Sequence, residues 1–372
     1  DRARRAAPAR TMAVVPQSVA LVAGRGIHHV TPPPIALEHP ARIVVIKMSA
    51  LGDVAKTVQT VRAIRLTFPV CAIGWVIRPV WAELVKGNPD VDAVIRAPRS
   101  LRGLIQAAQA IRRFRPDTLL DIQGLSTSGL LARVSGARRR FTWETGRELS
   151  NILTGKPIVP SHRDINVAEC NFGFARLLGA SELPTSPPEY LTLMNPTLAR
   201  MEELLASVPR PMVAMHTGAS APQKKWPTSH WIEAVRSLRA AGCGVVLLGG
   251  PGDVSEAQAV ARGAGEDVLV LAGRTGLKEL AAAAYLSSAF IGCDSGASHV
   301  AALVGTRVVC PMGATLPGHH GPYGDEHRIL YLGLSCSPCY RRPTCGGRYD
   351  CMSGITPSML VDACLQIVRR EG

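Results

Sequence analysis

Short apolar runs alternate with longer amphipathic stretches along most of the chain. In the first half the runs predict strands at Ile43–Ile46, Ala72–Ile77, Ala93–Arg96 and Thr118–Ile122. The stretches between them predict helices at Val54–Phe68, Trp81–Gly87 and Leu101–Phe114. Strands separated by helices are typical of a parallel sheet covered by helices on both faces.

The same alternation returns in the second half. It predicts strands at Met212–His216, Val245–Leu248, Val268–Leu271, Ala289–Gly292 and Arg307–Cys310. The corresponding helices are Ser229–Ala241, Ser255–Gly263, Leu277–Ser287 and Ala297–Val304. A proline-rich passage, Leu183–Pro196, fits no element and separates the halves. We therefore predict two doubly wound, parallel-sheet α/β domains, residues 41–190 and 191–372, with ligand bound at the carboxyl ends of their strands.

Residues 1–40 lack this periodicity. They include an Arg- and Ala-rich start and the sequence "TPPP" at Thr31–Pro34, so we interpret them as a disordered or non-native extension. The apolar stretch Met12–Gly24 is interrupted by Pro16, which argues against a secretory signal. No apolar run approaches the roughly 18 to 20 residues that a membrane-spanning helix needs.

The chain is strongly basic, with a formal net charge of +14. This charge fits phosphorylated substrates, anionic lipid or nucleic acid, or reflects only an arginine-rich composition. Arginine clusters occur at Arg112–Arg115 and Arg138–Arg140, where they are candidates for contact with a phosphorylated partner. Because the clusters are not interleaved with aromatic residues and match no DNA-reading motif, nucleic acid is not favoured. The cysteines before Cys336 are scattered, as in proteins of a reducing cytoplasm.

The first candidate site is "IVVIKMSALGDV" at Ile43–Val54, a strand followed by a turn. The turn brings Asp53 to the start of the next predicted helix. One interpretation is a helix-capping acid worth up to about 1 kcal/mol; the other is a catalytic carboxylate. A G-x-G-x-x-G fingerprint is missing because the turn has only Gly52, which disfavours a nicotinamide-binding domain.

The second candidate site is "HTGASAPQKKWP" at His216–Pro227, again after a predicted strand. Free N–H groups in such a small-residue loop bind phosphate oxygens, and Lys224 or Lys225 can neutralise their charge. The residue order is not that of a Walker loop. A solvated basic loop is the alternative interpretation.

The third candidate site is "GCDSGASHVAAL" at Gly292–Leu303. Ser295 and Gly296 would present N–H groups to an anion at a helix N-terminus, and His299 would lie one turn further on. Asp294 would hold the loop or accept a hydrogen bond from a hydroxyl group. The alternative is a structural histidine in a buried helix.

A cysteine-rich segment, residues 336–351, contains Cys336, Cys339, Cys345 and Cys351. Four thiols have the number of ligands of a structural metal site, and the C-x-x-C half is a good chelate. The later spacing is not that of a standard zinc ribbon. Reduced or partly paired structural cysteines are the alternative.

Together these segments resemble the ADP-heptose:lipopolysaccharide heptosyltransferases, inverting enzymes of glycosyltransferase family 9 with the two-domain GT-B fold. The resemblance covers nearly the whole chain after Arg42. It rests on the three candidate sites, on "DIQGLSTSGLLARVSGARRR" (Asp121–Arg140), "LLGGPGDV" (Leu247–Val254) and "GTRVVCPMGAT" (Gly305–Thr315), and on the cysteine-rich segment before "GITP".

The resemblance implies a role for each candidate residue. Asp53 would be the general base that deprotonates the acceptor hydroxyl, and Lys224 would neutralise the departing diphosphate, with no metal required for catalysis. The implied donor-binding residues are Gly218, Ser220, Gly249, Gly250, Asp253, Asp294, Ser295, Gly296 and His299. The implied acceptor-side residues are Ser49, Gly52 and Gln123.

The resemblance thus predicts transfer of a heptose from ADP-heptose to the Kdo/heptose–lipid A inner core of lipopolysaccharide. The expected partners are a nucleotide-sugar donor and a lipid-linked, phosphorylated saccharide acceptor. The expected location is the cytoplasmic face of the inner membrane, as a peripheral protein. Two alternatives stay open: a GT-B transferase or epimerase that uses another nucleotide sugar, and a non-catalytic protein that binds a nucleotide sugar or polyanion.

Overall fold

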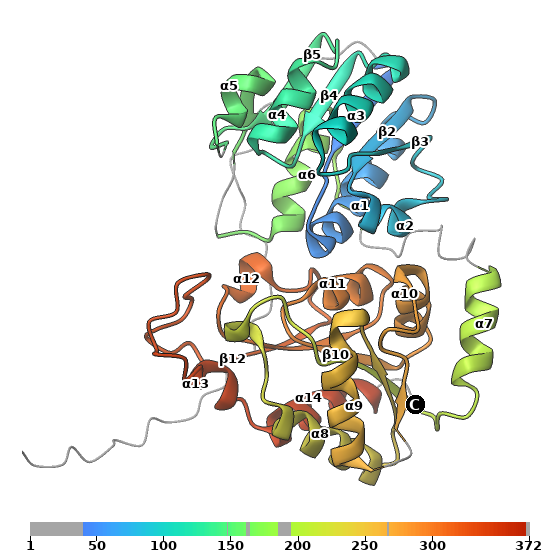
Figure 1. The fold of residues 1–372 in the computed structure, drawn as a ribbon, viewed down its shortest axis with the longest axis vertical. Helices are drawn as coiled ribbons and strands as arrows, with labels where there is room; N and C mark the ends of the chain where they lie inside the picture. Colours follow the sequence, from blue (N-terminus) through green and yellow to red (C-terminus); the bar gives the residue numbers. More distant parts are fainter. Residues whose placement is uncertain (1–39, 147, 161–163, 185–194, 266–267, 370–372) are drawn as a thin grey trace, which may run out of the picture.

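A computed structural model describes residues 40–146, 148–160, 164–184, 195–265 and 268–369 (Figure 1). In this part of the chain the strands form two six-stranded sheets, one from each half, and every strand pair is parallel. The predicted extension at residues 1–39 and the predicted domain boundary at residues 190–191 lie outside the described residues. Where the chain is described, no helix is both long and apolar enough to cross a membrane.

The first sheet has the strand order β3-β2-β1-β4-β5-β6. Its strands are β1 (Arg42–Ile46), β2 (Ala72–Ile77), β3 (Ala93–Arg96), β4 (Thr118–Asp121), β5 (Arg139–Trp143) and β6 (Lys156–Val159). The helices of this half are α1 (Leu51–Thr67), α2 (Ala82–Val85), α3 (Leu101–Phe114), α4 (Ser126–Arg133), α5 (Ser150–Thr154) and α6 (Val167–Leu177).

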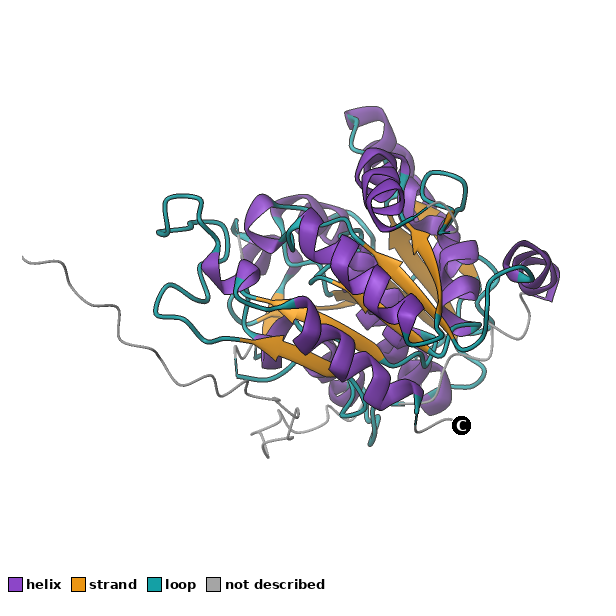
Figure 2. Ribbon diagram, turned by 90° about the horizontal axis from the view of Figure 1, so that it is seen from below, coloured by secondary structure: helices purple, strands orange, loops and turns teal. Residues whose placement is uncertain are grey.

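Strand β1 shows why helices cover both faces of this sheet. Ile43 and Val45 join the core cluster under α1 and α6, whereas Val44 and Ile46 join the cluster under α3 and α4. All four side chains are fully buried. Because successive side chains of a strand point to opposite faces, a continuous apolar run requires cover on both sides, and Figure 2 shows helices flanking the strands.

The second sheet has the strand order β12-β11-β10-β7-β8-β9. Its strands are β7 (Met212–His216), β8 (Gly244–Leu248), β9 (Leu269–Val270), β10 (Ala289–Gly292), β11 (Val308–Met312) and β12 (Arg328–Tyr331). The helices of this half are α7 (Asn195–Leu205), α8 (Thr228–Ala240), α9 (Val254–Ala264), α10 (Leu277–Tyr285), α11 (Gly296–Leu303), α12 (Pro317–His320), α13 (Asp350–Ser353) and α14 (Pro357–Val368).

The predicted α/β architecture is confirmed, but several predicted boundaries are wrong. Helix α1 begins at Leu51 instead of Val54, so Asp53 lies inside its first turn. The helix predicted at Trp81–Gly87 is a 3₁₀ turn, Pro79–Trp81, followed by the one-turn helix α2. The elements β5, β6, β12, α4–α7 and α12–α14 were not predicted.

The two halves contact each other through their helices. Helix α1 packs against α11, and α2 packs against α10 (Figure 1). One core cluster is continuous across this seam, from Val58 of α1 to Val300 of α11. The loops that follow β1 and β10, which hold two of the candidate sites, therefore meet where the halves face each other.

Candidate functional site

Asp53 lies in the first turn of α1 and is partly buried. Its Oδ2 accepts a hydrogen bond from the Ala50 N–H at 3.3 Å. Burial raises the pKa of the Asp53 carboxyl group, but Lys47, Lys56 and the Ala50 N–H outweigh this effect and hold it below its ordinary value of 3.8. Asp53 is thus both a helix-start acid and a carboxylate that is ionised at neutral pH, so the two interpretations of this residue are compatible.

Gln123 fixes the loop that precedes Asp53. Its Oε1 accepts hydrogen bonds from the backbone N–H groups of Met48 (2.8 Å) and Ser49 (3.0 Å). The Lys47 Nζ donates to the carbonyl of Ile122, beside Gln123, at 3.2 Å. The structure thus brings the three predicted acceptor-side residues, Ser49, Gly52 and Gln123, to one loop junction at the ends of β1 and β4.

Asp294 is the centre of a buried polar cluster after β10. Its Oδ2 lies 2.6 Å from both the Lys224 Nζ and the Thr315 Oγ1, and its Oδ1 lies 3.6 Å from the His299 Nε2. Burial acts to raise the pKa of Asp294, but the His299 ring and the Lys224 charge hold it well below its ordinary range. The Lys224 charge and the hydrogen bonds therefore keep the buried Asp294 carboxylate ionised.

The His299 imidazole is neutral at pH 7. Burial and the nearby Lys56 charge lower its pKa to about 4. Its Nδ1 is buried and has no hydrogen-bond partner in the described structure. A buried nitrogen without a partner in the first turn of α11 is a position that a bound ligand can satisfy.

A second polar network in this half consists of Ser295, His216 and Asp253. The Ser295 Oγ lies 3.2 Å from the His216 Nδ1, and the His216 Nε2 lies 3.3 Å from the Asp253 Oδ2. The same carboxylate accepts the Gly250 N–H at 2.8 Å. The pKa of Asp253 is lowered, mainly by its hydrogen bond to His216.

Two glycines leave room for the Asp253 side chain in this network. A Cβ on Gly218 would lie 2.1 Å from the Asp253 Oδ1, and a Cβ on Gly249 would lie 2.7 Å from the Asp253 Cβ. The predicted donor residues from three separate loops are therefore packed together at Asp253. Ser220, at the tip of its loop, is exposed.

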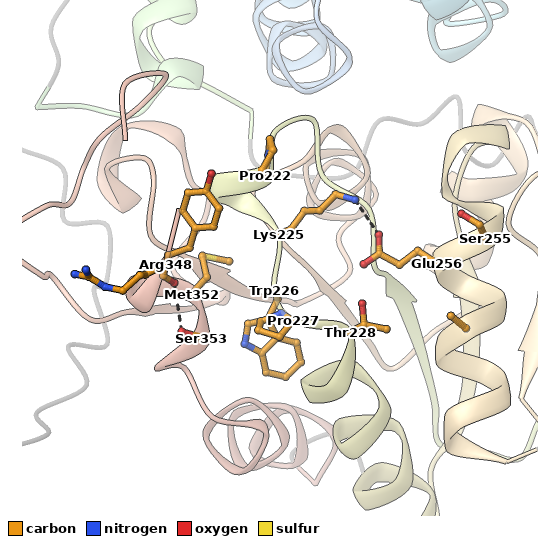
Figure 3. A pocket seen from close by; sticks show the side chains of 12 residues that line it. Pro222, Lys225, Trp226, Pro227, Thr228, Ser255, Glu256, Arg348, Met352 and Ser353 are labelled. Carbon is orange, nitrogen blue, oxygen red and sulfur yellow. Dashed lines mark hydrogen bonds and ion pairs between the residues drawn. The ribbon is translucent and has the colours of Figure 1, made fainter. Parts of the chain in front are cut away.

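The two lysines of the "QKKWP" sequence point to different partners. Lys224 pairs with Asp294, whereas the Lys225 Nζ lies 3.1 Å from Glu256 Oε2 on α9. Lys225, Glu256 and Trp226 line a cavity of about 450 Å³. Figure 3 shows the ion pair between Lys225 and Glu256 among its lining side chains. Because neither Asp294 nor Asp53 lines that cavity, it is not part of the polar cluster. The choice between the two lysines thus falls on Lys224.

The arginine clusters lie at the amino ends of the strands of the first sheet, whereas Asp53 lies at the carboxyl ends. Strand β4 begins at Thr118, which pairs with Arg139, and Arg115 comes just before it. Asp53 follows the other end of β1. The clusters Arg112–Arg115 and Arg138–Arg140 are thus at the amino ends of the strands, away from Asp53, and their contact with a phosphorylated partner stays a prediction.

Other arginines, which were not predicted as site residues, lie at the carboxyl ends of the strands, where Asp53 also lies. Arg78 follows β2, Arg96 ends β3, and Arg99 follows β3. The Arg78 Nη1 donates to the Ala97 carbonyl at 2.7 Å, while its buried Nε has no partner in the described structure. The signal that would have found them is their position after a predicted strand.

The four cysteines of the 336–351 segment are free thiols, Cys351 buried and the others partly exposed. Among the described residues, which include all four, no three or more His, Cys, Asp or Glu side chains are grouped closely enough to hold a metal ion. The thiols as placed do not form a ligand set. The predicted metal site stays a prediction, and no step of the chemistry below uses it.

The two halves bring Asp53 and the Asp294 cluster together. A Cβ on Gly52 would lie 2.4 Å from the His299 Cδ2, and a Cβ on Gly296 would lie 2.7 Å from the Leu51 Cβ. The N-terminal ends of α1 and α11 therefore touch. Asp53, next to Gly52, therefore lies beside the His299 ring and the start of α11, an arrangement suited to proton removal beside a departing anion.

Comparison with known proteins agrees with this geometry. A family model described as glycosyltransferase family 9 (heptosyltransferase) matches residues 104–349. The chain is 24% identical to lipopolysaccharide heptosyltransferase 1 of Escherichia coli (strain K12) over 310 residues, covering 77% of this chain and 92% of that protein. It is 26% identical to lipopolysaccharide heptosyltransferase 1 of Pseudomonas aeruginosa over 327 residues, covering 82% and 87%.

Solved structures share the fold. The family 9 glycosyl transferase of Veillonella parvula matches with a TM-score of 0.74 at 21% identity, covering 91% of this chain and 99% of that one. The Escherichia coli heptosyltransferase WaaC with ADP matches with a TM-score of 0.66 at 21% identity, covering 89% and 100%.

Proposed function

The chain belongs to glycosyltransferase family 9, and from this premise we propose that it transfers a heptose from ADP-heptose to the inner core of lipopolysaccharide with inversion at the anomeric carbon. Its fold is the predicted GT-B arrangement of two facing doubly wound sheets. Two similar proteins, from Escherichia coli and Pseudomonas aeruginosa, are lipopolysaccharide heptosyltransferases, and a heptosyltransferase of similar fold was solved with ADP. We assign residues 41–190 to the acceptor and residues 191–372 to the donor.

Asp53 is the proposed general base. Its pKa is below 3.8, so the carboxylate is ionised at neutral pH but is a weak base toward a hydroxyl group. Its help therefore comes late, when the attack on an oxocarbenium-like centre has made the hydroxyl proton acidic. The Gln123 contacts that fix the loop supply the positioning that such a base requires.

The donor diphosphate is proposed to bind at Lys224, at the N–H groups of Ser295 and Gly296, and at His299. The N-terminus of α11 and the Lys224 cation together stabilise the negative charge that the leaving group acquires, so catalysis needs no metal. A neutral His299 contributes a hydrogen bond in place of an ion pair. Asp294 orients Lys224, which it contacts at 2.6 Å.

The acceptor is proposed to lie along the carboxyl edge of β2 and β3. Arg78 and Arg99 follow these strands, and the unpartnered Arg78 Nε is available to a phosphate group. The same charges, each worth on the order of 1 kcal/mol at an anionic surface, support a peripheral position at the cytoplasmic face of the inner membrane.

The observation that carries the proposal is the meeting of Asp53 with the Asp294–His299 loop across the two halves. The test is transfer from ADP-heptose to a lipopolysaccharide acceptor lacking heptose, followed by mass spectrometry. In parallel, thermal shift with ADP-heptose and other nucleotide sugars at 100 times their dissociation constants detects about 2.7 kcal/mol of stabilisation. If only another nucleotide sugar stabilises the protein and supports transfer, that sugar and not ADP-heptose is the donor. Binding without any transfer would favour the non-catalytic alternative.

A further inference from the structure

Lys56 is a buried lysine in the seam between the halves. It lies on α1, three residues after Asp53, and is 6% exposed. Its Nζ donates a hydrogen bond of 2.9 Å to the carbonyl of His320 at the end of α12. The bond joins the helix that carries the proposed base to the half that holds the donor loops.

Two neighbouring contacts join the same parts of the structure. The Asn166 Nδ2 donates to the Gly321 carbonyl at 3.1 Å, and the His319 Nδ1 lies 2.6 Å from the Ile165 carbonyl. The α12 turn is therefore fixed to the first half at three consecutive residues. Lys56 is the contact on α1, while the other two come from the segment that leads into α6.

The Lys56 ammonium lies within the field of two carboxylates, the proposed base Asp53 and the orienting residue Asp294. The charged and titratable groups that face it are Asp53 on α1, Cys170 on α6, Lys224 before α8, Asp294 after β10, His299 on α11 and His320 on α12. Burial lowers the pKa of Lys56 to about 8, while Asp294 and Asp53 act to raise it. An apolar side chain of the same length would avoid this desolvation cost, so packing alone gives no reason for a charge here.

We propose that Lys56 is a positioning residue for sugar transfer, which holds the base Asp53 against the donor half of the cleft through its bond to His320. The inference rests on the proposed function for the reaction itself. Its physical content is that one ammonium group joins α1 to α12 across the seam and, together with Lys47, favours the ionised form of Asp53. Neither effect needs contact between Lys56 and the substrate.

The variants Lys56→Met and Lys56→Arg test this role, with Gln59→Met as the matched control. Gln59 lies on the same helix and lines the same small void beside His299. We expect Lys56→Met to lower kcat about 100-fold at a similar donor KM, Lys56→Arg to recover part of it, and Gln59→Met to behave as the wild type. The melting temperature of Lys56→Met should change little, because removal of a desolvated charge offsets the lost hydrogen bond to His320; a purely structural lysine would make it fall.

The pH dependence of kcat/KM gives a second test, in which the wild type is compared with Lys56→Arg. Wild-type kcat/KM should decline as the pH rises through about 8, where the Lys56 ammonium loses its proton. In Lys56→Arg this alkaline limb should move to higher pH, because a guanidinium group stays charged. An alkaline limb that is the same in both proteins overturns the inference.

Hydrogen exchange tests the contact without any enzyme assay. The His320 and Gly321 N–H groups bond within α12, and we expect both to exchange faster in Lys56→Met but not in Gln59→Met. Unchanged exchange in Lys56→Met overturns the inference whether or not sugar transfer is found. A wild type that transfers no sugar overturns the proposed function instead, and a Lys56→Met variant with normal kcat overturns the positioning role alone.

Discussion

The Gly52 backbone lies directly against the His299 ring, so close that a Cβ at residue 52 would be 2.4 Å from the ring Cδ2. The two residues come from different halves of the chain, one in the first turn of α1 and the other in α11. Only a residue without a side chain allows these helix ends to touch. The contact fixes the separation between Asp53, next to Gly52, and the start of α11, which contains His299.

Gly52→Ala should therefore separate the two loops. The methyl group overlaps the buried His299 ring, and a misplacement of about 1 Å costs roughly 100-fold in kcat. Alanine is a better helix former than glycine by about 1 kcal/mol, so α1 itself should not be weakened. Steady-state kinetics measures the fall in kcat, and the radius of gyration in solution measures the separation of the two halves. Gly318→Ala in α12 is the control, because no atom lies within 4 Å of its added methyl.

Asp53→Asn should abolish most of the transfer while leaving ADP binding nearly unchanged. Loss of a general base lowers kcat by roughly 100- to 10,000-fold, whereas the amide oxygen can still accept the Ala50 N–H. Because the pKa of Asp53 is below 3.8, wild-type activity should lose this base only as the pH falls through that lower value. Steady-state kinetics measures the loss of transfer and its pH dependence, and calorimetry measures the affinity for ADP. Substantial turnover in the variant would remove Asp53 from the mechanism.

Lys224→Met and Lys225→Met form a matched pair in one loop. Lys224 faces the donor cluster through Asp294, while Lys225 is half exposed and pairs with Glu256. A charge-assisted bond to a phosphate is worth about 1.5 to 3 kcal/mol, so Lys224→Met should weaken ADP binding about 10- to 100-fold and adenosine binding much less. Lys225→Met should change neither appreciably. Equal losses for ADP and adenosine in Lys224→Met would make it a general structural lysine.

Much of this site was predictable because its residues follow strands. In a doubly wound sheet the carboxyl ends of parallel strands form the ligand edge, so the loops that hold Asp53, Lys224 and Asp294 could be selected from the strand pattern. The family resemblance, and not position, favoured Asp53 as a base and Lys224 over its neighbour. What the sequence does not contain is the contact between the halves. No local pattern pairs Gly52 with His299, because that contact depends on how two separately folded sheets pack.

Lys56 and His216 were missed for a related reason, since the partners of both side chains lie far away in the sequence. A lysine in an amphipathic helix is expected to extend into solvent, and only the tertiary structure shows that α12 covers Lys56. The strand β5 was missed because it begins with Arg139 and Arg140, which is unusual for a buried strand. The Arg140 guanidinium donates to the carbonyls of Thr154 and Ala137, partners that are not visible in the linear sequence.

Asp294→Asn should change the pH dependence of stability. The folded-state pKa of Asp294 is far below its ordinary value of 3.8, so its contribution is complete above that value and is lost as the pH falls toward the folded-state pKa. Breaking a buried pair costs about 3 kcal/mol, and this should be the difference between the two proteins from pH 5 to 8. The difference should narrow below pH 4. Urea unfolding across this range measures it, and a constant difference down to pH 3 would contradict the assignment.

Metal removal separates the cysteine-rich segment from the reaction. This segment contacts the donor side of the cleft, because the Gln223 Nε2, next to Lys224, donates to the Tyr340 carbonyl at 2.8 Å. If the four thiols bind an ion, the purified wild type should carry metal that Cys336→Ser lacks. Elemental analysis of both proteins measures this, and equal metal contents would contradict the site.

The reaction itself should survive a strong chelator. The negative charge of the leaving diphosphate is balanced in this proposal by Lys224 and by the N-terminus of α11, groups that a chelator does not remove. We therefore expect kcat to be unchanged in EDTA, even if a structural ion is lost slowly and the loop around Tyr340 loosens. Initial rates measured immediately after EDTA addition and after prolonged incubation distinguish the two effects. An immediate loss of turnover that Mg²⁺ restores would show that a metal neutralises the diphosphate and that Lys224 does not suffice.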